Sequence, residues 1–343
     1  MTTTFRPHLR RLGATLALSL FVVTAFTKTQ DQPHYQAIDL GALGGINSVA
    51  NGINNNGIVV GTVQYQDGHV QAFYWSPTTG IQRLDPSAKQ SRALAINDRN
   101  IVAGALTDRN RLTTAVRWSL SGESTIIAEA PFGAFATSIN TRGDVVGFRE
   151  DGVFVVTENA FSWPPKDPSF AWNDLFDDDS QSFAQSINDK GQIVGYLDRQ
   201  AFLLNPNGKL KILAGDPLYG APAYGVDINN KSEVLISQWG AGFLYTNSKL
   251  NPIVGPGPVY PLALNDGGQV VGYVDTGNRS AFVWSNANGL SLIDDLLVTR
   301  GWQISSANAI NENGWIAGVG FHNGRERAVL LVPVKAPAKV ATP

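Results

Sequence analysis

The 343-residue chain contains no cysteine. This excludes disulfide bonds, thiol chemistry and anchoring through a lipid-modified cysteine. Only four residues are histidine, and charged residues make up 16% of the chain. None of His34, His69 and His322 has metal-ligand spacing to another, so we expect no metal and no cofactor. Glycine is abundant instead, at 35 residues, and low charge with many Gly, Asn and Thr is typical of short strands joined by tight turns.

The N-terminus has the pattern of a secretory signal peptide. Arg6, Arg10 and Arg11 precede an apolar run over residues 12–26, and small residues at 23–25 fit cleavage after Ala25. The run is short for a membrane span, and an uncleaved anchor is the alternative. We expect a secreted or periplasmic protein with residues 1–25 removed, 26–34 as a linker and no membrane span after cleavage. Cleavage removes three positive charges from a chain of formal charge −2, so we expect no nucleic-acid partner.

One pattern, small–x–small–Ile–Asn–x–x–Gly–x–Val–Val–Gly, recurs seven times. Its asparagines are separated by 43, 43, 48, 41, 36 and 46 residues. A period near 43 residues is the length of one four-stranded propeller blade. The anchoring residues are Asn54, Asn97, Asn140, Asn188, Asn229, Asn265 and Asn311.

Asparagine followed three residues later by glycine indicates a hairpin turn. The Asn side chain caps its own turn, and Gly takes the positive-φ position that closes it. The second repeat has Asn100 in place of that glycine, which the same conformation tolerates. The fifth repeat has Ser232 there, which predicts an altered turn.

Each repeat continues with two more strand patterns. One is Ala-Phe-x-Trp, at residues 72–75, 160–163 and 281–284. The other is short and apolar, as at residues 80–84 and 210–213. The unit is therefore four antiparallel strands, A to D from the axis outward. Tryptophans at equivalent places favour packing between blades over stacking on sugars.

The two ends of the repeat region predict how the ring closes. The seventh unit, from 303 to about 334, contains only strands A, B and C, whereas a spare D-like strand stands alone at 35–40. Pairing the two removes an open sheet edge. We predict an all-β, monomeric, seven-bladed propeller over 35–335, with a disordered tail at 336–343. Its units begin near residues 48, 91, 134, 182, 222, 260 and 303.

Asp39-Leu40-Gly41-Ala42-Leu43-Gly44-Gly45, the Ile-Asn-x-x-Gly-x-Val-Val-Gly core and Ala-Phe-x-Trp together resemble the HAF-type extracellular repeat of bacteria. The resemblance covers roughly residues 35–335 and implies an exported repeat protein. The family usually has His before Ala-Phe, where this chain has Gln71, Asn159, Gln200 or Ser280. The resemblance therefore transfers no catalytic residue.

The irregular loops hold the candidate binding residues. The B–C hairpins pair acids with bases and add aromatics, and they share one face with the D–A connections around the channel mouth. Such a surface suits a carbohydrate or a peptide, although exposed salt bridges are the alternative interpretation. Asp227 stands where other repeats have Gly, Ala or Ser, which indicates either a functional channel residue or a local bulge. The candidates are Tyr65, Asp67, His69, Asp108, Arg109, Arg149, Asp198, Arg199, Asp227, Trp239, Asp275, Arg279, His322 and Arg325.

An acidic cluster lies in the long third repeat, at Asp174, Asp177, Asp178 and Asp179. A calcium site there is the alternative to a solvated loop, whereas the Asn-rich turns lack the later acids that a calcium loop needs. Scattered acids and few histidines favour a non-catalytic binding or scaffold module with a carbohydrate or protein partner. The alternative is an extracytoplasmic glycan hydrolase or lyase, which would need titratable groups that converge on one point.

Overall fold

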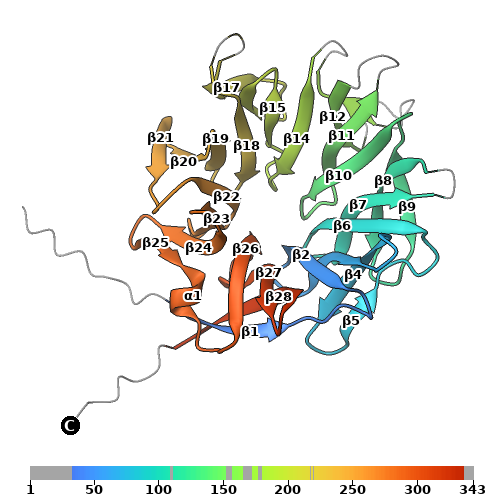
Figure 1. Cartoon of the computed structure of the whole chain (residues 1–343). Coiled ribbons are helices and arrows are strands. Elements are labelled where there is room, and N and C mark those ends of the chain that lie inside the picture. The colour runs from blue at the N-terminus through green and yellow to red at the C-terminus, as the bar shows by residue number, and fades with distance from the viewer. Residues whose placement is uncertain are drawn as a thin grey trace, which may run out of the picture.

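The computed structural model describes residues 33–108, 111–151, 157–164, 172–176, 180–216, 218 and 220–335. The expected signal peptide and C-terminal tail therefore lie outside the described residues. Within the described part, seven four-stranded antiparallel sheets surround a common axis (Figure 1). The prediction of a seven-bladed all-β propeller is confirmed.

Strands A to D of the first four blades are, in order, β2 (Asn47–Ile53), β3 (Val59–Gln64), β4 (Val70–Ser76) and β5 (Gly80–Arg83); β6 (Gln90–Ile96), β7 (Ile101–Thr107), β8 (Thr113–Ser119) and β9 (Ser124–Ala128); β10 (Gly133–Ile139), β11 (Val145–Asp151), β12 (Thr157–Trp163) and β13 (Asn173–Asp174); β14 (Ser182–Ile187), β15 (Ile193–Leu197), β16 (Gln200–Leu204) and β17 (Leu210–Gly215).

Strands of the last three blades are β18 (Ala223–Ile228), β19 (Val234–Gln238), β20 (Ala241–Thr246) and β21 (Lys249–Ile253); β22 (Val259–Leu264), β23 (Val270–Asp275), β24 (Arg279–Ser285) and β25 (Gly289–Leu292); β26 (Trp302–Ile310), β27 (Ile316–His322), β28 (Arg325–Val334) and β1 (His34–Asp39).

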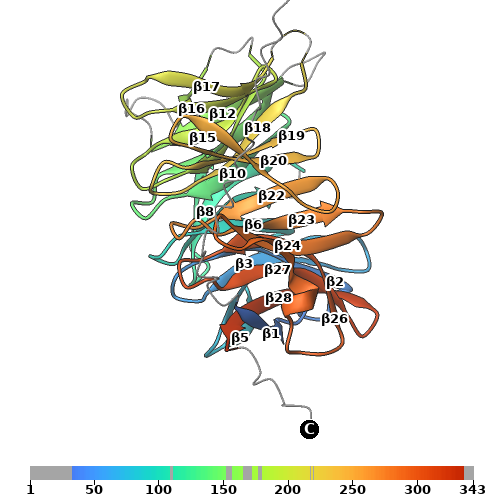
Figure 2. The same cartoon turned by 90° about the vertical axis from the view of Figure 1, so that its left-hand side faces the viewer.

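The ring closes through the first strand of the chain, as predicted. β1 pairs antiparallel with β28 over the whole of its length, from His34 opposite Val334 to Asp39 opposite Val329. The two strands lie side by side at the lower edge of Figure 1 and again in the view turned by 90° (Figure 2). Because β1 covers the outer edge of β28, neither end of the chain leaves the last sheet incomplete.

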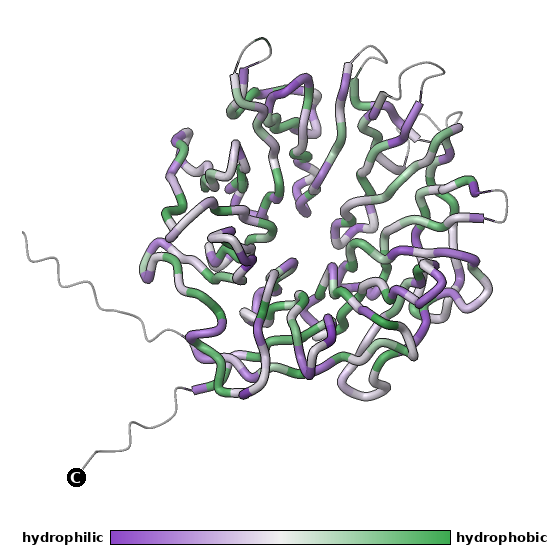
Figure 3. Tube along the Cα trace, viewed as in Figure 1, coloured by the Kyte–Doolittle hydropathy of each residue, from purple (hydrophilic) through white to green (hydrophobic). Residues whose placement is uncertain are grey.

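The apolar core lies between the blades. Each cluster of buried residues joins two neighbouring sheets, as where Phe73 of the first blade packs with Leu330 of the last. Hydrophobic stretches run along the strands and hydrophilic ones occupy the turns and loops (Figure 3). One element is not anticipated by the repeat: the single helical turn α1 (Ile293–Leu296), which buries Ile293 and Leu296 beside Tyr35.

Every strand A carries a β-bulge between the residues four and two positions before the anchoring Asn, as between Ala50 and Gly52. The bulge explains the last glycine of the repeat. An added Cβ on Gly104 would lie 1.9 Å from the carbonyl oxygen of Arg92, and equivalent clashes occur in five other blades. In these six blades the backbone approaches so closely that only glycine fits, whereas the fifth blade has Ile236 at this position.

The A–B turns follow the prediction with one exception. Gly57, Gly143 and their equivalents have positive φ, and Asn100 has φ 61°. The prediction of an altered turn at Ser232 is wrong: Ser232 has φ 67° and donates its N–H to the carbonyl of Asn229, at 3.1 Å. Asn229 imposes the turn by accepting the N–H groups of Lys231 and Glu233, at 3.0 and 2.9 Å.

Candidate binding face

The anchoring asparagines form a closed ring at the turn face, which is the end of the propeller that holds the A–B and C–D turns. Each is buried, and its Nδ2 donates to the backbone carbonyl of the asparagine in the next blade. The seven distances run from 2.8 Å, for Asn97 to Asn140, to 3.3 Å, for Asn140 to Asn188. Since Oδ1 meanwhile caps the local turn, one side chain both shapes its own blade and joins it to the next.

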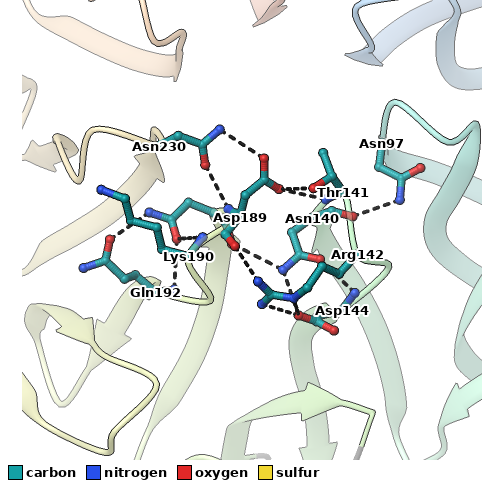
Figure 4. A network of polar contacts seen from close by, with 10 residues as sticks. Asn97, Asn140, Thr141, Arg142, Asp144, Asp189, Lys190, Gln192 and Asn230 are labelled. Atoms are coloured by element: carbon teal, nitrogen blue, oxygen red, sulfur yellow. Dashed lines mark hydrogen bonds and ion pairs between the residues drawn. The ribbon is translucent and has the colours of Figure 1, made fainter.

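The residues after these asparagines form a second polar ring. At six of the seven blade junctions a backbone N–H in one blade donates to a side chain of the next, as from Thr141 to Asp189 at 2.8 Å. Figure 4 shows Asp189 between Thr141 and Asn230. The ring borders a cavity of about 180 Å³ and includes four acids, Asp98, Asp189, Asp266 and Glu312. Burial raises the pKa of Glu312.

These carboxylates are already engaged by backbone N–H groups, which accounts for them without a ligand. Among the described residues, no group of three or more His, Cys, Asp or Glu side chains could hold a metal ion. The turn face is therefore a structural hub. A ring formed by Ile53 and its equivalents in the other blades separates the cavity at the turn face from a second cavity of about 250 Å³, which lies nearer the other end of the axis.

Asp227 lines that second cavity. Its Oδ1 accepts the hydroxyl of Ser186 at 2.7 Å and the N–H of Ile228 at 2.9 Å, and its Oδ2 accepts the N–H of Leu264 at 2.8 Å. Burial raises the pKa of Asp227, and the three hydrogen bonds oppose that rise. The bulge beside it occurs in every blade, so Asp227 is distinguished by bridging three successive blades rather than by a local irregularity.

The other candidate residues lie at the opposite end, the loop face, which holds the B–C hairpins and the D–A connections. In the first blade the ring of Tyr65 stacks on His69, with centroids 4.3 Å apart, and His69 pairs with Asp67. Hydrogen bonds from its backbone groups and its side chain to Asp67 lower the pKa of that carboxyl. Asp108 caps its own hairpin by accepting the N–H of Leu112 at 2.9 Å, and Arg109 lies outside the described residues.

Several predicted acid–base neighbours are not paired with each other. Asp198 accepts the N–H of Gln181 at 3.0 Å, whereas Arg199 donates to the carbonyl of Gly220 at 2.9 Å. Asp275 caps its turn through the N–H of Gly277 at 3.1 Å. Arg279 lies over the ring of Tyr273, 4.6 Å from its centroid.

In the last blade, His322 stacks on Trp302 with centroids 4.5 Å apart and contacts the carbonyl of Gly301 at 3.0 Å. Arg325 lies directly opposite His322 across the hairpin and is exposed. In the fifth blade, Trp239 has φ 49° and is 81% exposed.

The acidic cluster is largely outside the described residues, which include none of Asp177, Asp178 and Asp179. Asp174 accepts Nε of Arg149 at 2.9 Å and Nε1 of Trp172 at 3.1 Å. Arg149 also forms an ion pair with Asp151. Arg149 and Asp174 therefore stabilise the edge of the third blade.

The loop face carries an aromatic arc that no single motif of the sequence predicts. The residue five before the anchoring Asn pairs with the residue eight after it in every blade, and in blades three to six these positions are mostly aromatic. Ring contacts run continuously from the third blade to the fifth, with neighbouring centroids 4.8 to 6.1 Å apart. The arc comprises Phe135, Phe148, Phe183, Tyr196, Tyr224, Tyr260 and Tyr273. Aligning the repeats on their asparagines would have revealed it.

Exposed apolar residues gather on the same face. Among the described residues, four exposed large hydrophobic side chains lie on outer D strands, and none lies in an A–B or C–D turn. The remaining eight lie on the loop face: Ile46, Phe132, Leu218, Tyr224, Trp239, Val254, Val298 and Phe321. Of the two ends of the ring, only the loop face exposes large apolar side chains among the described residues, which makes it the candidate binding face.

No family model and no curated protein matches this sequence. Solved structures match its fold. A prolyl endopeptidase has a TM-score of 0.55 at 13% identity, covering 85% of this chain and 51% of its own. A puromycin hydrolase variant has 0.54 at 12%, covering 89% and 58%. The acylaminoacyl peptidase of Pyrococcus horikoshii has 0.50 at 10%, covering 88% and 53%. This chain thus spans little more than half the length of each, and identities this low show the propeller fold alone. No helix in the described residues is both long and apolar enough to cross a membrane.

Proposed function

We propose that this protein is an exported, monomeric binding module that holds a carbohydrate or protein ligand on its loop face and does not react with it. The proposal rests chiefly on the aromatic arc, which lies where rigid strands present side chains around the channel mouth. The expected signal peptide and the resemblance to HAF-type extracellular repeats support export.

Of the two ligand classes, carbohydrate fits the arc better. From the third blade to the fifth the rings contact one another in sequence around the mouth, and Tyr224 in the arc is 38% exposed. Trp239 stands beside the arc, because Gly240 accepts the N–H of Val259 at 2.7 Å and so holds its turn against β22. Aromatic faces combine apolar contact area with polar edges, which suits the faces of sugar rings.

The test is a glycan and peptide array probed with the purified protein and with Trp239→Ala. Because Trp239 is 81% exposed, its removal should leave the melting temperature within about 1 °C of wild type, as expected for a surface substitution. Binding should weaken about tenfold or more, as for an aromatic anchor. Leu250→Ala, an exposed apolar residue on an outer strand, is the control and should bind normally. Unchanged binding by Trp239→Ala would move the site away from this face.

A glycan hydrolase or lyase is the second candidate, and one observation favours it. Glu150 and Glu158 lie directly opposite each other on β11 and β12. Burial and, to a smaller extent, the charge of Glu150 raise the pKa of Glu158. A glycan hydrolase needs such a pair, in which one carboxyl group stays protonated as the acid and the other stays ionised as the base or nucleophile. Incubating each bound glycan with wild type and Glu158→Gln, and measuring new reducing ends, separates the candidates. Release by wild type alone would establish the enzyme.

A further inference from the structure

Arg92 is the one charged residue at a ring position that is otherwise apolar, aromatic or small. It stands five residues before Asn97, and the other six blades have Val49, Phe135, Phe183, Tyr224, Tyr260 and Ser306 there. The register of strands A and B is the same in all seven blades, with Arg92 opposite Ala105. Arg92 therefore lies beside the third-blade end of the aromatic arc.

The guanidinium of Arg92 is exposed and, among the residues that the structure describes, has no hydrogen bond, ion pair or aromatic ring as partner. The arginines nearest the arc elsewhere differ: Arg279 lies over Tyr273, and Arg149 forms ion pairs. Arg92 is thus a cation held on a rigid inner strand with its bidentate donors unused.

Arg92 borders a cavity of about 410 Å³ on the loop face, between the last, first and second blades. Its polar lining includes Asn47, Asn51, Thr62, Gln64, Arg92 and Glu326. Glu326 lines the same cavity but forms no ion pair with Arg92, so each side chain can bind a different group of a ligand. Amide, hydroxyl and carboxylate groups bind sugar hydroxyls, whereas a guanidinium fork matches a planar carboxylate.

We propose that the loop-face ligand is an acidic glycan, and that Arg92 binds the carboxylate of a uronic acid unit whose neighbours lie along the aromatic arc. This rests on the proposed function, since it names the ligand class of the same face. A neutral glycan offers no carboxylate to the guanidinium fork of Arg92. An acidic oligosaccharide would place a uronate on Arg92 and the units next to it along the aromatic rings.

The test compares oligosaccharides of galacturonate, mannuronate and guluronate with their methyl esters, which keep the chain and remove the charge. Titration calorimetry with wild type should show that one acidic chain binds at least about tenfold more tightly than its ester, the scale of a charge-assisted pair. Arg92→Gln should abolish that preference and leave binding of the ester unchanged. Arg92→Lys should retain part of it, because it keeps the charge but loses the fork. Lys249→Gln removes the same charge from the outer strand β21 and should behave as wild type.

The outcomes separate the two proposals. Equal binding of acid and ester by wild type, or an undiminished preference in Arg92→Gln, overturns the acidic ligand while the binding module stands. Absence of binding to every glycan, acidic or neutral, overturns the acidic ligand, and absence of binding to every glycan and every peptide overturns both proposals. Melting temperatures that match wild type exclude misfolding of the Arg92 variants, as expected for an exposed residue.

Discussion

Asn97→Ala removes a side chain that is 4% exposed and makes three hydrogen bonds. Oδ1 accepts the N–H groups of Arg99 and Ile101, each at 3.0 Å, and Nδ2 donates to the carbonyl of Asn140 at 2.8 Å. At about 1 kcal/mol net for each bond, the variant should lose about 3 kcal/mol of unfolding free energy. For a domain of this size that corresponds to a fall in Tm of roughly 6 °C.

Urea unfolding followed by tryptophan fluorescence measures the loss, and two further variants assign it. Asn97→Asp keeps the acceptor for the local turn but turns an oxygen toward the carbonyl of Asn140, so it should cost about as much as Asn97→Ala. Asn207→Ala removes an exposed turn cap, bonded only to the N–H of Lys209, and should cost less than about 1 kcal/mol. Near-wild-type stability of Asn97→Asp would refute the bond between blades as a source of stability.

Three further predictions concern the rest of the ring. Deletion of residues 33–40 should expose the edge of β28. Amides 328–333 should then exchange quickly, as measured by mass spectrometry, and the protein should associate on size-exclusion chromatography. A monomeric protein whose amides 328–333 stay protected would contradict the closure. Gly57→Ala should lower the melting temperature of the protein more than Gly68→Ala does. Both glycines have positive φ, which costs an alanine about 1–2 kcal/mol, but only at Gly57 would the added Cβ also lie 2.9 Å from the Trp315 ring. Burial raises the pKa of Asp227 in the folded state, so its contribution to stability is full below the unfolded pKa of 3.8 and falls as the pH rises through the raised pKa. In urea melts between pH 4 and 8, wild type should therefore lose stability relative to Asp227→Asn as the pH rises. Parallel stability curves for the two proteins would contradict a raised pKa of Asp227.

The number of blades and the closure could be predicted from sequence because both depend on residues that a turn or a strand requires locally. An asparagine followed three residues later by glycine, as at Asn54 and Gly57, specifies a turn in each repeat where the pair occurs. The lone strand at 35–40 has one sheet edge with which it can pair, that of the incomplete last blade. The fifth turn cannot be predicted from Ser232 alone, because Asn229 fixes its conformation by accepting the backbone N–H groups of Lys231 and Glu233.

The site was harder to predict for a different physical reason. The partners of Phe183 include Phe148 and Tyr224, residues 35 and 41 positions away, and their contact depends on the curvature of the ring and on the bulge in strand A. The alternation of acids and bases favours Asp198 and Arg199 as binding residues, whereas in the structure both form hydrogen bonds to backbone groups. In a repeat protein the binding surface is formed by equivalent positions of neighbouring repeats, so it is found by comparing the repeats with one another.

The pairing of β1 with β28 also changes what the chain ends can do. In most domains unfolding and proteolysis start where a terminus peels away. Here the first and last strands hold each other inside one sheet, and asparagine bonds tie that sheet to both neighbours. Releasing either end therefore requires the pairing of β1 with β28 to break and removes a strand from the last blade. If the protein is exported as proposed, this pairing would protect the ends of the propeller from proteases without the help of disulfide bonds.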